Sequence, residues 1–510
     1  MRAKFFPLLK IISLGALVTF AHAPFFFWPA AMFALFFFLP NWLEANSAKQ
    51  AFAKSFGFFF GFFLAGTYWI AHALLVDAEQ FAVFVPLAVF LLAAGLALFH
   101  AFTAYVAWQV AEEKYLRVAA FIFAWWIAEW LRISLFGGFP WLSSGYAAAS
   151  HPLVFQAGAL FGEMGLSLLM LCFWLVPRLF YWPGMPKNPR VFSAVTVILL
   201  CVAVLSYGFY RLPSSAEPLV EGVRFRLVQP NIQQSLKWQP GVREKTLEML
   251  LNFSARPGWQ QVTHVVWPEA AIPYVVHPDD GLVRMLRETL PSSVSLIAGA
   301  MRGDRFPEAP QKVWNSLFVF KSKIGVDKFY DKHHLVPFGE FIPLKSFLPI
   351  NKLTFGDSDF ARGRGAETVE IQGVGGVSPL ICFEVIFPEN VVSRRMERPK
   401  LLLNLTNDGW FAGSLQPYQH FAMARLRAVE QGLPLLRLSN IGISAMFDSY
   451  GRITASLPLN YAGILDANLP RAGERTLFSA AGRAVSLLMV YVLGCAVIVA
   501  SFSSPQKTIL

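Results

Sequence analysis

Long runs of uncharged, mostly apolar residues fill the first two hundred positions of the chain, and one more such run lies near its end. Asp, Glu, Lys and Arg are absent from 11–38, 55–76, 80–111, 191–210 and 484–506. A helix needs about 20 apolar residues to cross a bilayer, so each run is long enough to span a membrane at least once. The pattern therefore predicts a bundle of transmembrane helices.

The number of spans follows from the interruptions in this pattern. Pro24 divides the first run into two rather short spans, because proline disfavours a continuous helix. Two further apolar segments, near 117–136 and 153–177, contain isolated charged residues. These are Glu129, Arg132 and Glu163. The first two have the i, i+3 spacing of a helical pair and could interact with each other. We expect about eight spans in all.

An alternative reading of the N-terminus is a cleavable signal peptide, because basic residues precede an apolar stretch that ends in Ala-His-Ala at 21–23. The next residue is a proline, which is unfavourable directly after a cleavage site, and another apolar run follows at once. We therefore favour a first span that is retained.

The charges in the short loops predict the orientation of the bundle. Every second loop is basic and contains Lys or Arg at positions 2, 4, 10, 49, 54, 114, 117, 178, 187 and 190. The loops between them contain Asp77 and Glu79, or no charge over 137–152. Basic loops stay in the cytoplasm. Both termini are then cytoplasmic, and the large region between the seventh and eighth spans lies outside.

Three regions result from this topology: a bundle of seven spans at 1–212, an extracytoplasmic domain at 213–478, and a final span with a short tail at 479–510. In the middle region, buried apolar strands alternate with amphipathic helices, which predicts a layered α/β domain. The strand-like runs are 223–228, 262–267, 294–298, 316–320, 377–382, 401–405 and 435–438, and the helical patterns are 241–255, 279–290 and 418–431.

One stretch of this domain is unusually apolar. It contains Phe341-Ile342-Pro343-Leu344, Phe347-Leu348-Pro349-Ile350, Leu353 and Phe355. Apolar residues are often simply buried, so the stretch could be a core loop. Because it directly follows the candidate site residue Glu340, we favour a mobile lid that rests on the bilayer over a lipid entrance.

Composition supports the membrane assignment and limits the partners. Hydrophobic residues make up 55% of the chain and charged residues only 15%, against about 25% charged in a typical soluble domain. The formal net charge is +11, but many of the basic residues lie in short loops between apolar runs. No basic arm is interleaved with aromatic residues, so we expect a membrane partner and no nucleic acid.

Cys382 is the candidate nucleophile. Of the four cysteines only this one lies in the outer domain, since Cys172, Cys201 and Cys495 fall in predicted spans, and it therefore has no disulfide partner there. A lone cysteine can be an ordinary buried hydrophobe. Cys382, however, ends an apolar strand, where side chains emerge at a sheet edge, and Glu384 follows two residues later.

A nucleophilic cysteine needs a base or a cation nearby to form its thiolate. One candidate set is Cys–His–Asn, with His333 or His334 as the base. The other uses the acids and the lysine of two dense segments, 267–269 and 331–340. These are Glu269, Lys332 and Glu340. An acid that directly follows an apolar strand and a proline has left the sheet edge, where site residues collect. The residues alone leave both sets open.

A resemblance of three motifs, which occur in the same order as in a known family, favours the set of acids and lysine over the Cys–His–Asn set. Trp-Pro-Glu at 267–269, Lys-His-His-Leu-Val-Pro-Phe-Gly-Glu at 332–340 and Ile-Cys-Phe-Glu at 381–384 resemble the Glu–Lys–Cys signature of the nitrilase superfamily. More narrowly, nearly the whole chain resembles the bacterial apolipoprotein N-acyltransferases. The further matching segments are Gly-Phe-Pro-Trp at 138–141, Gln-Pro-Asn-Ile at 229–232 with Trp238, Asn-Asp-Gly-Trp-Phe at 407–411, and Asn-Ile-Gly-Ile-Ser at 440–444.

The resemblance implies a nitrilase-like αββα sandwich outside the membrane and an acyl transfer. The donor would be a phospholipid, typically phosphatidylethanolamine, and the acceptor the α-amino group of a diacylglyceryl-Cys apolipoprotein. Glu269 would be the general base, Cys382 the nucleophile that forms a thioester, and Lys332 the cation that stabilises thiolate and oxyanion. Glu340 and Glu384 would support them. We expect no cofactor and no metal, and a location in the bacterial inner membrane with the catalytic domain in the periplasm.

The resemblance also suggests residues that contact the substrate. These are Trp238, Trp410, Phe341 and Phe383. Many relatives carry Tyr where this chain has Phe383, so any hydrogen bond of that hydroxyl is absent and the residue is left with a packing role. His333 and His334 belong to the family motif, and we interpret them as structural.

Two rival functions remain. A membrane-anchored amide or ester hydrolase with the same triad would discharge its thioester to water, although eight spans are many for an anchor. A transporter or receptor would use the outer domain only to bind a ligand and would tolerate loss of Cys382. The apolar runs contain few charges and show no interrupted helix pair of the transporter type.

Overall fold

The computed structural model describes residues 2–110, 113–181, 187–305, 308–347, 352–354, 358–482 and parts of 484–495. Within it the chain forms two compact units. A helical unit comprises Met1–Ala71, Val83–Ser214 and Thr476–Leu510, and an α/β unit comprises His72–Ala82 and Ser215–Arg475. These borders lie close to the predicted ones at 212 and 478, except that the short segment around α5 (Ala78–Phe81) groups with the α/β unit.

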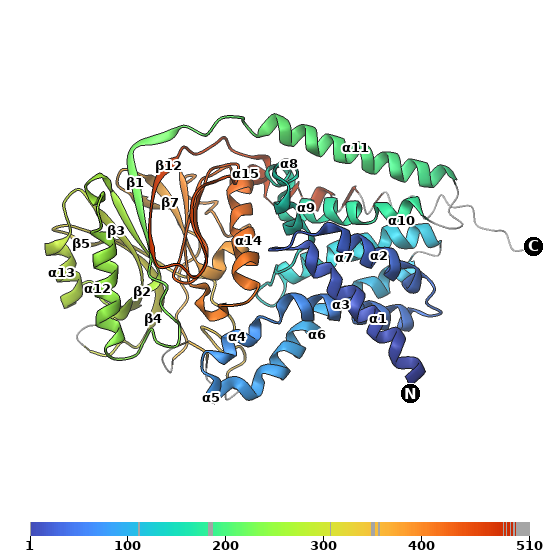
Figure 1. The fold of residues 1–510 in the computed structure, drawn as a ribbon, viewed down its shortest axis with the longest axis horizontal. Helices are drawn as coiled ribbons and strands as arrows, with labels where there is room; N and C mark the ends of the chain where they lie inside the picture. Colours follow the sequence, from blue (N-terminus) through green and yellow to red (C-terminus); the bar gives the residue numbers. More distant parts are fainter. Residues whose placement is uncertain are drawn as a thin grey trace, which may run out of the picture. The chain divides into compact units, whose positions relative to one another are not determined.

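The helical unit is built from helices of very different length (Figure 1). They are α1 (Arg2–Val18), α2 (Trp28–Leu43), α3 (Ala48–Thr67), α6 (Val85–Val110), α7 (Lys114–Ser134), α8 (Pro152–Phe155), α9 (Gly158–Trp174), α10 (Val176–Phe180), α11 (Lys187–Arg211) and α15 (Leu477–Ala481), with 3₁₀ turns η1 (Thr19–Ala21), η2 (Ala82–Phe84) and η3 (Ser144–Ser150). The short helix α4 (Ile70–Leu75) begins in this unit, and its residues from His72 onward group with the α/β unit. The first apolar run is divided between α1 and α2 on either side of Pro24, as expected.

Three segments among the described residues are long and apolar enough to cross a membrane: Ala78–Val110, Gly158–Arg178 and Ala194–Arg211. Pro7–Ala21 and Trp28–Leu43 are shorter apolar helices. The run at 484–506 lies largely outside the described residues. The total of about eight spans therefore stays a prediction.

Glu129 and Arg132 of α7 do not pair directly, contrary to what their spacing suggested. The Arg132 Nη1 donates to the carbonyls of Phe139 and Trp141, at 3.1 and 2.8 Å. The Glu129 Oε1 accepts from the backbone N–H and the hydroxyl of Ser144, at 2.9 and 2.7 Å. Both charges thus hold the irregular segment that follows α7. Non-helical backbone carries unpaired polar groups, and these need such partners when they are buried.

The α/β unit contains two six-stranded sheets. The first runs in the order β12 (Gly463–Pro470), β1 (Leu219–Gln229), β2 (His264–Val276), β3 (Ser295–Gly303), β4 (Val313–Lys321), β5 (Gly325–Asp331). The second runs β11 (Ile453–Leu457), β10 (Ser444–Phe447), β9 (Leu435–Ser439), β8 (Leu401–Thr406), β7 (Gly375–Ile381), β6 (Val369–Ile371). The central neighbours β1–β2–β3 and β7–β8–β9 pair in parallel, and the outer strands pair antiparallel.

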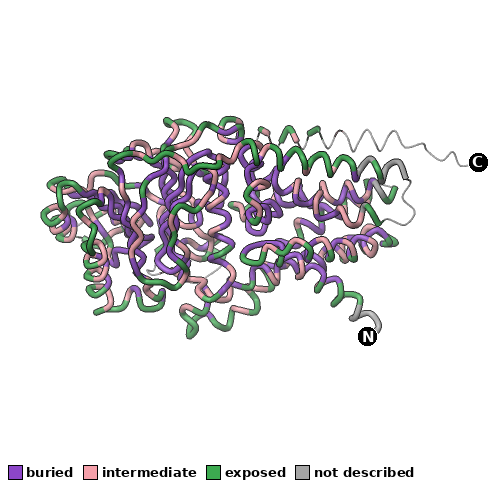
Figure 2. The backbone as a smooth tube through the Cα atoms, turned by 45° about the horizontal axis from the view of Figure 1, so that its top comes forward, coloured by how far each residue is buried: buried purple, intermediate pink, exposed green. Residues whose placement is uncertain are grey.

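The two sheets pack face to face around one apolar core. On β2, Val266 points into this core, whereas Val265 and Trp267 face the other side of the sheet, as the period of two requires. The outer face of the first sheet is covered by α12 (Val242–Ser254) and α13 (Gly281–Thr289), and α14 (Gln416–Gln431) packs against β9. Figure 2 shows the strands as mostly buried. The arrangement is the expected αββα sandwich.

Candidate active site

Cys382 lies where β7 ends and a short 3₁₀ turn, η5 (Cys382–Ile386), begins. Its φ is 53°, a left-handed conformation that residues other than glycine seldom adopt and that accumulates at functional sites. Burial and the nearby carboxylate of Glu269 raise the pKa of the Cys382 thiol, and Lys332 offsets only part of this effect. The resting side chain is therefore a thiol, and a base must remove its proton before it can attack.

Glu269 lies inside a bulged strand, not beyond the strand's end as the sequence suggested. The pairing of β2 with β3 shifts register between Trp267 and Ile272, and Pro268, which has no N–H to donate, fits this irregularity. Opposite the bulge, a Cβ on Gly299 would lie 2.5 Å from the Pro268 carbonyl oxygen and 2.7 Å from the Glu269 Cα. Glycine is therefore required there, because any side chain would displace Glu269.

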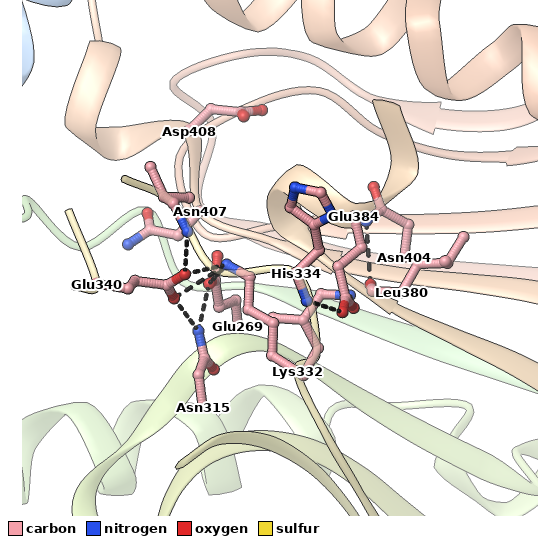
Figure 3. A network of polar contacts seen from close by, with 12 residues as sticks. Glu269, Asn315, Lys332, His334, Glu340, Leu380, Glu384, Asn404, Asn407 and Asp408 are labelled. Atoms are coloured by element: carbon pink, nitrogen blue, oxygen red, sulfur yellow. Dashed lines mark hydrogen bonds and ion pairs between the residues drawn. The ribbon is translucent and has the colours of Figure 1, made fainter. Parts of the chain in front are cut away.

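Lys332 follows β5 and connects two carboxylates (Figure 3). Its Nζ lies 2.9 Å from Glu340 Oε2 and 3.8 Å from Glu269 Oε1. The amide of Asn315, on β4, donates to Glu269 at 2.7 Å and to Glu340 at 3.1 Å. The second oxygen of Glu340 also accepts from the Val336 N–H at 2.8 Å. Four residues that are distant in the sequence thus form one buried cluster.

The charges of this cluster fix its protonation. Burial raises the pKa of Glu269, and its contacts with Lys332 and Asn315 lower it only in part. Burial alone would lower the pKa of Lys332, but the two carboxylates outweigh it and the net shift is upward. The lysine is therefore a permanent cation, and Glu269 is a carboxylate that accepts a proton more readily than usual.

Glu384 forms a second group of contacts and ties the lysine segment to the cysteine segment. Its carboxylate accepts from the backbone N–H groups of Ile381, His333 and His334, at 2.7, 2.8 and 3.1 Å. The Tyr330 hydroxyl lies 3.0 Å away. Burial would raise the pKa of Glu384, but the bonds from His333 and Ile381 and the charge of Lys332 lower it overall.

The two histidines of the alternative Cys–His–Asn set are engaged elsewhere. The ring Nδ1 of His333 lies 2.7 Å from Glu384 and 2.7 Å from the Tyr330 hydroxyl. The ring of His334 stacks on Phe387, with the ring centres 3.7 Å apart. The geometry favours the set of acids and lysine over the histidine set.

The aromatic residues expected at the substrate differ in their surroundings. Trp238 and Phe341 pack against one apolar cluster, which includes Ala270 next to Glu269. Phe383 is buried against the rings of His334 and Phe387, consistent with packing. Trp410 is partly buried in η6 (Asp408–Phe411), and within the described residues no hydrogen bond or ring contact joins it to the cluster around Glu269.

The expected lid is only partly described. Phe341 is partly buried and Ile342 fully, whereas Leu344 and Phe347 are 72% and 79% exposed. Residues 348–351 and 355–357 lie outside the described residues. The first part of the stretch is therefore core, whereas Leu344 and Phe347 are exposed apolar side chains, and the lid stays a prediction.

Several residues of the site gave no signal in the sequence. Asn315 lies in the middle of a strand, and Lys237, which donates to the Glu269 carbonyl at 3.1 Å, directly precedes a noted tryptophan. Asp408, from the matching segment at 407–411, forms a buried group with His420 and Arg437, which gave no signal; their contacts are 2.7–3.2 Å long. Within the described residues, no three His, Cys, Asp or Glu side chains gather as they would around a metal ion.

Comparisons with known proteins match both units. The apolipoprotein N-acyltransferase N-terminal domain matches residues 14–176, and the carbon-nitrogen hydrolase family matches residues 224–477. An apolipoprotein N-acyltransferase of Rhodopseudomonas palustris is 34% identical over 94% of this chain and 93% of its own length. Another, of Rhizobium etli, is 37% identical over 91% and 90%. An amidase from Nesterenkonia sp. AN1 superposes on 54% of this chain and all of its own, with 20% identity and a TM-score of 0.38.

Proposed function

Because the chain belongs to the apolipoprotein N-acyltransferase family, we propose that it moves a fatty acyl chain from a phospholipid, through a thioester on Cys382, to the N-terminal amine of a diacylglyceryl-Cys apolipoprotein. The donor we propose is phosphatidylethanolamine, and the product is the mature triacylated lipoprotein. The observation that carries this proposal is the buried Glu269, with its raised pKa and its link to Lys332, beside a cysteine in a strained turn.

In the first half-reaction Glu269 takes the proton of the Cys382 thiol, and the sulfur attacks the ester carbonyl carbon of the phospholipid. The C–S bond forms and the carbonyl oxygen becomes an oxyanion, which Lys332 stabilises. When the oxyanion collapses, the ester C–O bond breaks and the lysophospholipid leaves with the proton held by Glu269. The enzyme then carries a thioester, and Glu269 is again a carboxylate.

In the second half-reaction the neutral amine of the apolipoprotein attacks the thioester carbonyl. Glu269 takes one N–H proton, the C–S bond breaks, and the same proton returns to the sulfur of Cys382. Glu340 holds Lys332 in place through two contacts near 3 Å. Glu384 fixes the backbone next to both Cys382 and Lys332. It accepts from the N–H of Ile381, directly before the cysteine, and from the N–H of His333, directly after the lysine.

We further propose that the helical unit crosses the bacterial inner membrane about eight times, with both termini in the cytoplasm and the α/β unit in the periplasm. The distribution of basic loops supports this topology, as does the presence of three helices of spanning length. The exposed Leu344 and Phe347 would then meet the outer leaflet. Cysteine labelling of intact cells, with single cysteines placed at positions 79 and 187, tests it. Labelling by a membrane-impermeant maleimide is expected only at 79.

The test of function is intact-protein mass spectrometry of the enzyme purified from membranes, before and after neutral hydroxylamine, with Cys382→Ala in parallel. We expect a long-chain acyl mass that hydroxylamine removes and that the variant lacks. Adding a diacylated lipopeptide should discharge it onto the peptide amine. Discharge to water at the same rate with and without the lipopeptide would make the protein a hydrolase and contradict the proposal.

A further inference from the structure

Lys237 is a buried cation that the mechanism above does not use. It lies in the segment between β1 and α12 and is 2% exposed, whereas its neighbour Leu236 is exposed and its neighbour Trp238 is only partly buried. Lysine is almost never fully buried unless its charge is paired. The burial of this ammonium group therefore needs an explanation.

The hydrogen bonds of Lys237 leave most of its donors free. Its Nζ donates to the backbone carbonyl of Glu269 at 3.1 Å. The described residues provide no other hydrogen bond and no carboxylate within ion-pair distance of it. A lysine ammonium has three N–H donors, so two remain unused. A buried N–H donor without an acceptor is unfavourable. The two unused donors of Lys237 therefore indicate that a bound ligand supplies the missing acceptor.

The contrast with Lys332 shows which lysine is available to a substrate. Lys332 Nζ lies 3.0 and 2.9 Å from the two oxygens of Glu340 and 3.8 Å from Glu269. Two carboxylates therefore surround it and largely neutralise its charge. Lys237 makes only a carbonyl contact, so its charge is not cancelled by an ion pair within the described part of the chain.

The charges that act on Lys237 are those of the reacting groups. Burial lowers the pKa of Lys237 to about 8, and the carboxylate of Glu269, together with Cys382 once it is ionised, acts in the opposite direction. In the resting enzyme the ammonium is thus retained mainly by its interaction with Glu269. The interaction is mutual. The Lys237 ammonium therefore stabilises the Glu269 carboxylate and also a thiolate on Cys382.

We propose that Lys237 is a further catalytic residue, whose two free N–H donors bind the oxygen of the reacting acyl group and stabilise the negative charge that develops at Cys382 and on that oxygen. This inference rests on the proposed acyl transfer and adds no proton transfer to it. Lys237 stays protonated throughout, while Glu269 alone carries the moving proton. Lys332, whose charge is shared with two carboxylates, then stabilises the oxyanion together with Lys237, whose positive charge no ion pair compensates within the described residues.

The test compares wild type with Lys237→Met, a variant of similar shape without charge, using the full-length enzyme in detergent. Three quantities are measured: release of lysophospholipid in a single turnover with phosphatidylethanolamine, the pH dependence of iodoacetamide labelling on the peptide that contains Cys382, and the melting temperature. The matched control is Lys245→Met, which removes an exposed lysine of α12.

We expect Lys237→Met to slow acyl-enzyme formation by about 10²-fold, the usual effect of removing one donor to an oxyanion. The labelling of Cys382, whose thiol also faces Glu269, Lys332 and Asp408, should move to higher pH. The melting temperature should stay or rise, because an undersatisfied buried cation is removed. Lys237→Arg should recover part of the rate, and the control should match wild type.

A purely structural lysine would give the opposite pattern. An unchanged labelling profile, or a fall in rate that only parallels a fall in melting temperature, would overturn the inference. If Lys237→Met does not fold, Lys237→Gln, which keeps an N–H for the Glu269 carbonyl, is judged by the same readouts. If wild type forms no acyl-enzyme, the proposed function fails, whereas the labelling profile still reports on Lys237.

Discussion

Glu269 and Glu384 are both buried carboxylates near Cys382, yet their surroundings shift their pKa values in opposite directions. Glu269 receives one short hydrogen bond, from Asn315, and a longer contact of 3.8 Å with Lys332. Glu384 receives three backbone N–H groups and lies 2.7 Å from the ring of His333. The pKa of Glu269 is raised and that of Glu384 is lowered.

This difference supports the proposed division between Glu269 as a base and Glu384 as a scaffold. A carboxylate that is buried with few donors is ready to take a proton, because its charged form is poorly stabilised. A carboxylate that accepts several charge-assisted or backbone bonds keeps its charge and fixes whatever donates to it. When their surroundings give two carboxyl groups different pKa values, the two groups can take different roles, one exchanging a proton and the other staying charged. The following predictions test this division.

The largest effect is expected for Glu269→Gln. Glutamine has nearly the same shape and can still accept from Asn315, but it cannot take the proton of Cys382. We expect acyl-enzyme formation to slow by about 10²–10⁴-fold, the range for loss of a general base, with little change in melting temperature. Single-turnover release of lysophospholipid measures the rate. A variant that keeps a tenth of the wild-type rate would show that another group is the base.

Glu384→Gln should instead act on stability. The NH₂ group of the new amide would face backbone N–H donors, which are donors like itself. The negative charge that accepted their hydrogen bonds would be lost. We expect the free energy of unfolding to fall by about 3 kcal/mol, the lower end for breaking a buried charged contact. Chemical unfolding in detergent measures it. Glu288→Gln, at a side chain that is 71% exposed, is the control and should change little. A stable but inactive Glu384→Gln would assign this residue to the chemistry.

A smaller loss is expected for His333→Ala. The variant keeps the backbone N–H that bonds Glu384 and removes the ring, with its contacts of 2.7 Å to Glu384 and to the Tyr330 hydroxyl. One hydrogen bond to a charged group contributes about 1.5–3 kcal/mol, and we expect a loss near the lower value. Activity per folded molecule should persist. A collapse of acyl-enzyme formation at unchanged stability would revive the histidine as the base of the nucleophile.

The mildest test uses pH alone. Because the pKa of Glu269 is raised, its proton-accepting form is lost as the pH falls through a value above the ordinary carboxyl range. Glu384 has a lowered pKa in the folded protein, so its stabilising charge is present above the unfolded pKa and is lost only as the pH falls through the lower folded value. An interval of pH is therefore expected in which the enzyme is folded but inactive. Activity should return on neutralisation, whereas simultaneous loss of activity and melting transition would contradict the division.

Local sequence patterns located the central strands of both sheets but not their edges. The seven predicted runs coincide with β1–β4 and β7–β9, which are apolar because both their faces are covered. The edge strands, such as β5 with two exposed residues and β11, alternate or are polar and resemble loops. Glu269 was expected beyond a strand, since nothing in Trp-Pro-Glu indicates that the chain resumes pairing with β3 after the bulge.

The separation into an apolar helical part and an α/β part could be predicted from the residues alone, because hydrophobic runs and alternation are local properties. The sequence also singled out Cys382, and the resemblance of three motifs assigned roles to Glu269 and Lys332. The packing of the two sheets joined Asn315 to both acids, gave Glu384 its backbone donors and brought Lys237 against Glu269, and none of these contacts could be read from the sequence. Charge, burial and pKa depend on neighbours that are distant in the chain, so no pattern of nearby residues can specify them.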